Sequence, residues 1–334
     1  MNLTFTTATK EQAKARIALA GPTGSGKTYT ALVTATGLGE RIALIDTEHG
    51  SAAKYADEFV FDTLPLSTFQ PTTLVEALAV AAHDGYDVMI VDSLSHFWSG
   101  TGGMLEQVDN AAKRLGAGGS FAGWKEARPQ ERAMIDALLA YPGHLIVTMR
   151  TKTEYVVEAD ERGRKVPRKI GLKPEQREGI EYEFDIVGDL DHENTLVISK
   201  SRAKPLSGTV LHRPGPEFAE AVLSWLETGT PARSVSDYVT AATAPDAGHE
   251  ELRALYEEAR RHNLLGAAVL DDTGQTHTLG QLIVRHGTAA ARNRVAEDVE
   301  AGTGRENGTG RKDGTGRKAG AGRENGAERK GAAV

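Results

Sequence analysis

The stretch GPTGSGKT, residues 21–28, combines closely spaced glycines with a lysine and a threonine. Glycines let the backbone turn its N–H groups toward an anion, and the N-terminus of a following helix adds its dipole. The lysine can bridge the outer phosphates of a nucleotide, and the threonine hydroxyl can hold Mg²⁺. The sequence therefore predicts a nucleotide-phosphate site made of Gly21, Pro22, Thr23, Gly24, Ser25, Gly26, Lys27, Thr28 and Tyr29.

A carboxylate follows an apolar run further along the chain. The stretch DVMIVDS, residues 87–93, predicts a strand that ends in Asp92. A carboxylate at the carboxyl end of a parallel strand beside the phosphate loop can hold Mg²⁺ through water. We expect Thr28 and Asp92 to form the magnesium site, with Ser93 assisting. The alternative is that Asp92 caps the next turn.

A second acidic pair lies in LIDTEHG, residues 44–50, where Asp46 ends a predicted strand and Glu48 follows it. A glutamate at this edge of a sheet can align and deprotonate the attacking water. Asp46 is the competing candidate, although its position at the strand end suits the capping of a turn. We expect Glu48 to be the catalytic base and the lone His49 to be a turn residue.

Two cations lie close together in VISKSRAK, residues 197–204. Lys200 and Arg202 are two positions apart, so on a strand they would point to the same face. The stretch contains no acidic residue to pair with them, and unpaired charges are costly to bury. They are therefore either exposed cations on an edge strand or groups that act on an anion.

The elements that must position these groups alternate along the chain. Apolar runs predict strands at 16–20, 41–46, 87–92 and 144–149, and helix-like stretches lie between them at 27–37, 71–83 and 127–140. This alternation is typical of a parallel sheet covered by helices on both faces. After residue 183, FDIVGDL, NTLVISKS and GTVLH follow one another with short turns and predict antiparallel strands at one edge.

Composition divides the chain into four parts. An α/β core is expected over 1–228, a Pro-, Ala- and Thr-rich linker over 229–248, and a small helical appendage over 249–290. Residues 291–334 end in a Gly/Arg/Lys-rich hexapeptide repeat with few apolar residues, which predicts a disordered tail. The basic tail contrasts with the net charge of the whole chain, which is −7 and argues against a general nucleic-acid coat.

The bulk composition narrows the classes of protein that this chain can belong to. The 334 residues are 40% apolar, which is enough for a sizeable core. No run reaches the roughly 20 apolar residues that span a bilayer, and the N-terminus lacks the pattern of a secretory signal. Since there is no cysteine, disulfides, thiolate zinc sites and iron–sulfur clusters are excluded. We expect a cytoplasmic protein without membrane contact.

Taken together, these motifs resemble the RecA-like P-loop ATPases. LIDTEHG is similar to the segment that carries the catalytic glutamate of that family, and TLVISKSRAKPLSG, residues 195–208, to its late strand with a K-x-R pair. The resemblance implies that Lys200 and Arg202 reach the γ-phosphate held by a neighbouring copy in a homo-oligomeric ring or filament. It also implies that Thr148 is the polar γ-phosphate sensor, with Arg150 beside it.

A closer resemblance is to phage RecA-core ATPases, including the Sak-type single-strand annealing proteins. It rests on KIGLKPEQREGIEYEFDIVGDLD, residues 169–191, followed by SKSR, and it covers about 14–215. It implies a DNA-stimulated, Mg²⁺-dependent ATPase that acts on single-stranded DNA in phage recombination, in the host cytoplasm, with a single-strand-binding protein as a possible partner. The N-K-x-D motif of GTPases is lacking, so ATP is the expected nucleotide. The alternatives are a hexameric helicase-like or packaging motor, and an annealing module that ATP switches without hydrolysis.

Two segments that follow core strands are candidate DNA contacts. In LGAGGSFAGW, residues 115–124, Phe121 can stack on unpaired bases, whereas Trp124 is expected to begin a helix and pack inward. The second segment, 150–178, carries a run of cations without an acid between them: Arg162, Arg164, Lys165, Arg168, Lys169 and Lys173. These cations either neutralise backbone phosphates or lie solvated on a hairpin whose turn is EADERG.

Overall fold

The computed structural model describes residues 13–116, 119–159, 165–229 and 232–303, with side chains outside 153–172 and 295–303. The chain divides into two units, Met1–Ala290 and Ala291–Val334. Most of the predicted disordered tail lies outside the described residues. No helix in the described ranges has the length and apolar character needed to cross a lipid bilayer.

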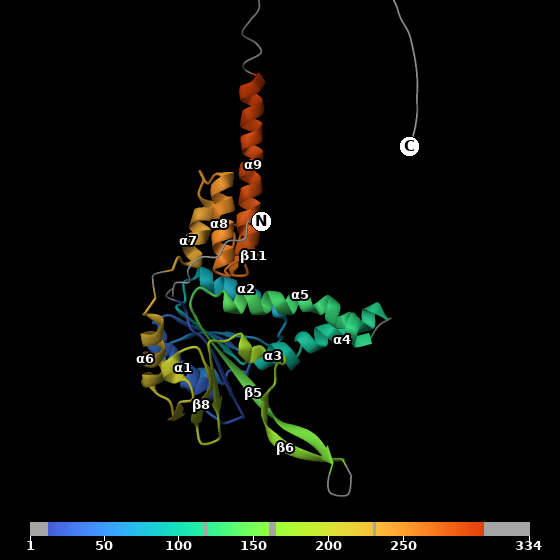
Figure 1. The fold of residues 1–334 in the computed structure, drawn as a ribbon, viewed down its shortest axis with the longest axis vertical. Coiled ribbons are helices and arrows are strands. Elements are labelled where there is room, and N and C mark those ends of the chain that lie inside the picture. The colour runs from blue at the N-terminus through green and yellow to red at the C-terminus, as the bar shows by residue number, and fades with distance from the viewer. Residues whose placement is uncertain (1–12, 117–118, 160–164, 230–231, 304–334) are drawn as a thin grey trace, which may run out of the picture. The chain divides into compact units, whose positions relative to one another are not determined.

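A nine-stranded sheet, most of it parallel, forms the centre of the first unit (Figure 1). The path of eight strands runs β3 (Asp62–Pro65), β2 (Ile42–Asp46), β4 (Val88–Asp92), β5 (His144–Ala159), β1 (Arg16–Gly21), β7 (Ile186–Leu190), β8 (Thr195–Ser201) and β9 (Val210–His212). Strands β8 and β9 are antiparallel to their neighbours at one edge. The predicted α/β class, a mostly parallel sheet with antiparallel edge strands, is therefore confirmed.

Helices cover both faces of the sheet, as Figure 1 shows. One face packs against α1 (Lys27–Leu38) and α6 (Pro216–Leu226), and the other against α2 (Pro71–His83) and α5 (Gly119–Leu139). Because side chains alternate along a strand, Ile17 belongs to the first core and the next residue, Ala18, to the second. This burial on both faces explains why the strands are continuous apolar runs in the sequence.

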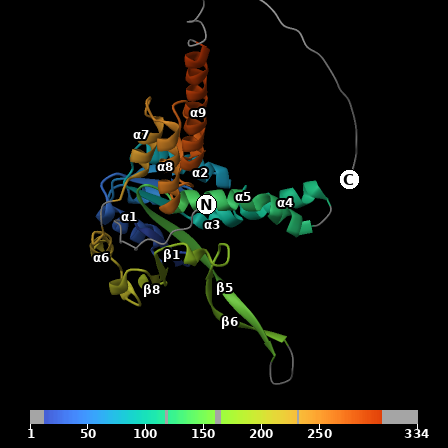
Figure 2. The same cartoon turned by 45° about the horizontal axis from the view of Figure 1, so that its top comes forward.

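Two arms extend from the sheet, and both are visible in Figures 1 and 2. One is the helical pair α4 (Met104–Leu115) and α5, which follows the short helix α3 (Leu94–Ser99). The other is a β-hairpin in which the long strand β5 pairs with β6 (Lys165–Pro174). The apolar signal of β5 ended at residue 149 because beyond that point the strand leaves the buried sheet.

The segment expected to be a linker, 229–248, contains the helix α7 (Val235–Thr243), which corrects that expectation. A capping box between Ser234 and Asp237 begins the helix, and Tyr238 is buried. Its apolar face shares a core with α8 (His249–Arg261). A helix of nine residues is marginal by itself, and the packing of its apolar face against α8 stabilises it.

The appendage is not purely helical, in contrast to the prediction. Between α8 and α9 (Leu279–Thr303) lies a two-stranded hairpin of β10 (Ala268–Leu270) and β11 (Thr276–Thr278). Helix α8 ends at Arg261, and α9 continues past residue 290 into the segment predicted to be the tail. The hairpin was missed because each of its strands is three residues long.

His144, the first residue of β5, is a buried neutral histidine. Its Nδ1 accepts a hydrogen bond from the backbone N–H of Ala15 at 3.1 Å. Burial lowers the pKa of His144 to about 3, compared with about 6.5 in an unfolded chain. Between these values the unfolded chain binds the extra proton, so the contribution of the neutral ring is complete above about pH 6.5 and is lost as the pH falls toward 3.

We therefore expect His144→Gln to weaken the dependence of the unfolding free energy on pH. Glutamine keeps an acceptor for Ala15 but cannot be protonated. In urea titrations below pH 6.5, the wild type should lose about 1 kcal/mol more per pH unit than this variant. His83→Gln, at an exposed position of α2, is the control and should keep the wild-type slope. If the unfolding free energy depends equally on pH in all three proteins, His144 is not the buried neutral histidine that we describe.

Candidate active site and nucleic-acid interface

The glycine-rich stretch forms the loop between the end of β1 and the start of α1. Gly24 and Gly26 both have φ of +81°, a conformation that side chains rarely adopt. A Cβ on Gly21 would lie 2.7 Å from the carbonyl oxygen of Leu190. The loop therefore needs glycine at these positions, and its backbone is free to approach a ligand.

The loop has the groups that a phosphate requires. The Lys27 ammonium donates to the carbonyl oxygens of Gly21 and Pro22, at 3.0 and 2.9 Å. Burial lowers the pKa of Lys27, while the charges of Asp92 and Glu48 oppose that shift. The Ser25 hydroxyl is buried and has no hydrogen-bond partner among the described residues. A cation and an unsatisfied hydroxyl at a helix N-terminus fit a nucleotide phosphate.

Asp92 brings together the predicted magnesium ligands. Its Oδ2 accepts a hydrogen bond from the Thr28 hydroxyl at 2.6 Å, and its Oδ1 accepts one from the Thr148 hydroxyl. Burial raises the pKa of Asp92, and the two hydroxyls act against that rise. The neighbouring Ser93 hydroxyl is buried without a partner in the described part of the chain. Hydroxyl and carboxylate oxygens are ligands that Mg²⁺ prefers, so Thr28 and Asp92 fit this ion.

Glu48 lies at the same edge and forms a two-pronged ion pair with Arg150. The Nε–Oε1 and Nη2–Oε2 distances are 2.8 and 2.6 Å. Burial acts to raise the pKa of Glu48, but hydrogen bonds and charge from Arg150 hold it below the ordinary value. Asp46 accepts a hydrogen bond from the Glu48 backbone N–H at 2.7 Å, so it caps the turn. His49, with φ of +56°, lies in that turn.

A polar network that the sequence analysis did not single out joins the ends of β2 and β4. The Thr47 hydroxyl accepts a hydrogen bond from the backbone N–H of Ser93 at 2.6 Å and lies 2.6 Å from His96 Nδ1. Burial lowers the pKa of His96, so the ring is neutral near pH 7. The sequence signal that could have indicated this network was the polar run DSLSH, directly after the buried strand.

Two further residues flank the phosphate loop. Tyr29 lies on the outer side of α1, where its hydroxyl donates to Glu58 Oε1 at 2.5 Å. Asn194, in the turn between β7 and β8, places Nδ2 2.9 Å from where a Cβ on Gly26 would lie. Tyr29 was among the predicted binding residues, whereas Asn194 was missed because nothing in its neighbourhood marks it as close to the loop.

Lys200 and Arg202 do not lie at this chain's own phosphate loop. Strand β8 runs antiparallel to β7 and ends at Ser201, beside the residues where β1 and β7 begin. The phosphate loop follows the opposite end of β1. The prediction that Lys200 and Arg202 share one face of a strand is also wrong. A register shift between Val187 and Gly188 interrupts the pairing of β7 with β8, and Arg202 lies beyond the end of β8.

Both cations have partners within the chain. Lys200 Nζ donates to three backbone carbonyls, those of Glu181, Tyr182 and Phe184, at 2.9, 2.8 and 2.6 Å. Arg202 Nη1 lies 3.1 Å from Asp185 Oδ1, and its side chain is 60% exposed. The acidic partner missing from the local stretch thus comes from Asp185. Of the two side chains, Arg202 is the one with freedom to move.

The first candidate DNA segment is largely helical rather than a glycine-rich loop, which corrects its expected form. Helix α5 already begins at Gly119, and Phe121 is 82% exposed in its first turn. Trp124 packs inward as expected, with its ring centroid 5.7 Å from that of Trp98. Phe121 therefore remains available to a ligand, whereas Trp124 is half-buried.

The second candidate segment is the β5–β6 hairpin, the form that the sequence left open as an alternative. Lys165, Arg168 and Lys169 lie on β6, while Arg162 and Arg164 lie outside the described residues. Lys173 Nζ is 3.2 Å from Glu178 Oε1. A role for these cations in binding DNA stays a prediction.

Comparison with known proteins identifies the region that carries the site. A protein-family model described as an AAA domain matches residues 13–211, more than half of the chain. The matched region runs from before β1 to within β9 and includes the phosphate loop, Glu48, Asp92 and Thr148. No curated protein matches the chain.

Proposed function

The chain belongs to the AAA domain family of nucleotide-binding P-loop ATPases, and from this premise we propose that it is a Mg²⁺-dependent ATPase acting on single-stranded DNA in phage recombination or annealing. The observation that carries the proposal is the convergence of Thr28, Asp92 and Glu48 from three separate segments at one edge of the sheet. We further propose a homo-oligomeric ring or filament, with a single-strand-binding protein as a partner.

Each group in the proposed site has a distinct task. The loop N–H groups and Lys27 bind the phosphates of ATP, and Thr28 and Asp92 hold the metal. Bound Mg²⁺ would neutralise charge on the phosphate oxygens. Thr148 keeps the Asp92 carboxylate oriented through its second oxygen. Glu48 orients the attacking water and accepts its proton, once its carboxylate is released from Arg150.

The position of Arg150 supports stimulation by DNA. It holds Glu48 and belongs to β5, the strand that continues into the hairpin with the cationic run. A phosphate backbone bound along the hairpin would shift the strand and with it the guanidinium. In our proposal, Arg150 then turns from Glu48 to the γ-phosphate, and hydrolysis follows DNA binding.

The same ion pair favours a second candidate function, an annealing module that ATP binding switches without hydrolysis. A glutamate engaged at both oxygens by a guanidinium does not activate water. If the ion pair between Glu48 and Arg150 persists when ATP is bound, ATP is not hydrolysed, and its binding changes only how copies of the chain assemble. DNA annealing would then proceed at an undiminished rate in a protein that cannot turn over ATP.

We expect single-stranded DNA to raise the ATPase rate several-fold, and Arg150→Gln to abolish that dependence by removing the ion pair with Glu48. The measurement is phosphate release with and without oligothymidylate, at low and high salt, since phosphate contacts weaken with salt. The Lys27→Ala variant gives the background rate of phosphate release, because it lacks the ammonium group of the phosphate site. A wild-type rate that DNA does not change at any salt concentration would refute the DNA part of the proposal and leave the ATPase in place.

A further inference from the structure

Three adjoining hollows border the exposed side of α5. One of about 660 Å³ lies toward Trp98 and Arg177, one of about 360 Å³ toward Gly266, and one of about 780 Å³ toward Arg202. Asp136 of α5 lines all three, so the hollows adjoin one another along the helix. We call them together the α5 trench. Each has the size of a small-molecule or nucleotide site.

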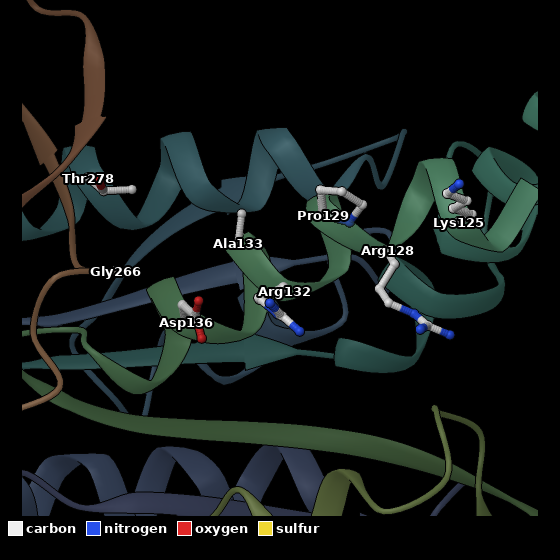
Figure 3. A pocket seen from close by; sticks show the side chains of 8 residues that line it. All are labelled: Lys125, Arg128, Pro129, Arg132, Ala133, Asp136, Gly266 and Thr278. Carbon is white, nitrogen blue, oxygen red and sulfur yellow. The ribbon is translucent and has the colours of Figure 1, made fainter. Parts of the chain in front are cut away.

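A cationic stripe of α5 runs along this trench. Lys125, Arg128 and Arg132 are three and four residues apart, a spacing that puts them on one helix face. Figure 3 shows Arg128 and Arg132 leaving the same side of the helix, as does Asp136. All three cations are exposed, and none forms a hydrogen bond or ion pair with a described residue. Guanidinium groups with a free fork of donors are suited to phosphate.

The charge of the trench is opposite to that of the chain. Nine Lys and Arg side chains and five carboxylates line the three hollows, whereas the whole chain carries a net charge of −7. Four of the five carboxylates are already paired: Glu131 and Glu183 with Arg177, Asp185 with Arg202, and Glu178 with Lys173. Burial raises the pKa of the fifth, Asp136, and the charge of Arg132 opposes that rise. The uncompensated charge is therefore positive.

An aromatic pair lies at one end of the trench. The half-buried rings of Trp98 and Trp124 are 5.7 Å apart with an interplanar angle of 33°, and both line the hollow of about 660 Å³. Arg128 lines the same hollow. Aromatic faces beside cations are the combination that binds single strands, because bases stack on the rings while phosphates pair with the cations.

We propose that the α5 trench is a binding site for single-stranded nucleic acid, in which Lys125, Arg128 and Arg132 contact the phosphate backbone and the Trp98–Trp124 pair receives a base. This inference rests on the proposed DNA function, but it assigns binding to a surface other than the β5–β6 hairpin and the exposed Phe121. Stacking and phosphate contacts do not read base edges, so binding at this site is independent of sequence.

The test is the salt dependence of oligothymidylate binding, measured by fluorescence anisotropy on the full chain. The triple variant Lys125→Ala, Arg128→Ala, Arg132→Ala should lower the slope of log K against log salt by about 2 and weaken binding roughly 100-fold at 0.1 M salt. The matched control Lys54→Ala, Lys204→Ala, Arg253→Ala removes the same charge from exposed positions outside the trench and should leave the slope unchanged. An equal loss in both triple variants, or a loss in neither, would overturn the inference.

Tryptophan fluorescence provides a second measurement that does not depend on charge. The chain has three tryptophans, and Trp225→Phe would leave only the pair in the trench. We expect oligothymidylate to quench this fluorescence in proportion to the bound fraction, and unquenched fluorescence at saturation would count against stacking. A wild type that binds no single strand refutes the proposed DNA function itself. Binding that is lost only with Lys165→Ala, Arg168→Ala, Lys169→Ala refutes the trench alone.

Discussion

Arg202→Ala should lower kcat for ATP at least about 10³-fold in the assembled protein, the loss expected for an arginine that stabilises phosphoryl transfer from a neighbouring subunit. Arg202 lies at the edge of the sheet where β1 begins, whereas the phosphate loop follows the other end of that strand. If Arg202 acts on ATP at all, it acts on the ATP of another copy.

The contacts of Arg202 fit such a movable group. Its side chain is 60% exposed, and the ion pair that it forms with Asp185 is of the partly exposed kind that contributes little stability. Lys200 differs, because three backbone carbonyls hold its ammonium in place. The structure therefore separates two cations that look equivalent in the sequence, and it makes Arg202 the better candidate for a group lent to a neighbour.

A mixing experiment checks the prediction. Glu48→Gln and Arg202→Ala should each be nearly inactive alone, whereas an equal mixture should recover turnover at about a quarter of the interfaces, those with both intact halves. Lys204→Ala, an exposed cation two residues further along, is the control and should keep full activity. If no mixing ratio restores turnover, or if the wild type is fully active as a monomer at every dilution, Arg202 does not act in trans.

Glu48→Gln should lower kcat about 10²- to 10⁴-fold and leave ATP affinity nearly unchanged, because it removes the proton acceptor without removing a phosphate contact. Glutamine is isosteric and keeps an acceptor oxygen for Arg150, which limits structural disturbance. Turnover is measured by phosphate release and binding by a fluorescent ATP analogue, so that the two effects are separated.

Asp46→Asn is the matched control for the choice of base. The Asp46 side chain caps the turn by accepting from the Glu48 backbone N–H, and asparagine retains that acceptor. The control should therefore keep most of the wild-type rate. If Asp46→Asn loses turnover and Glu48→Gln does not, the assignment of the base is reversed.

Single-strand annealing measured on Glu48→Gln also decides between the two candidate functions. Only a module that ATP switches without hydrolysis keeps its annealing activity in this variant.

Local signals were sufficient to predict much of the core. The predicted helix 71–83 corresponds to α2 at both ends, because a proline at the first position and an apolar stripe mark it. The phosphate loop is encoded by glycines that must adopt positive φ, and the parallel strands by apolar runs buried on both faces. Each of these features depends on residues close together in the chain.

The partners of the site residues could not be predicted in the same way. Thr148 reaches Asp92 because β5 lies beside β4 in the sheet, and Arg150 reaches Glu48 because β2 lies on the other side of β4. The helix α7 lies in a segment read as a linker, because its stability comes from packing against α8. Likewise, the acidic partner of Arg202 is Asp185, the residue that precedes β7.

The sequence by itself determined the α/β class, the phosphate loop and the polar residues at the strand ends, since glycine conformation and strand burial act over a few residues. Only the tertiary structure decided that Glu48 is held by Arg150, that Lys200 is held by carbonyls, and that the cations of α5 line a trench. The physical reason is that ion pairs, hydrogen bonds and cavities are made by groups that are distant in the chain, and strand order and helix packing decide which of them meet.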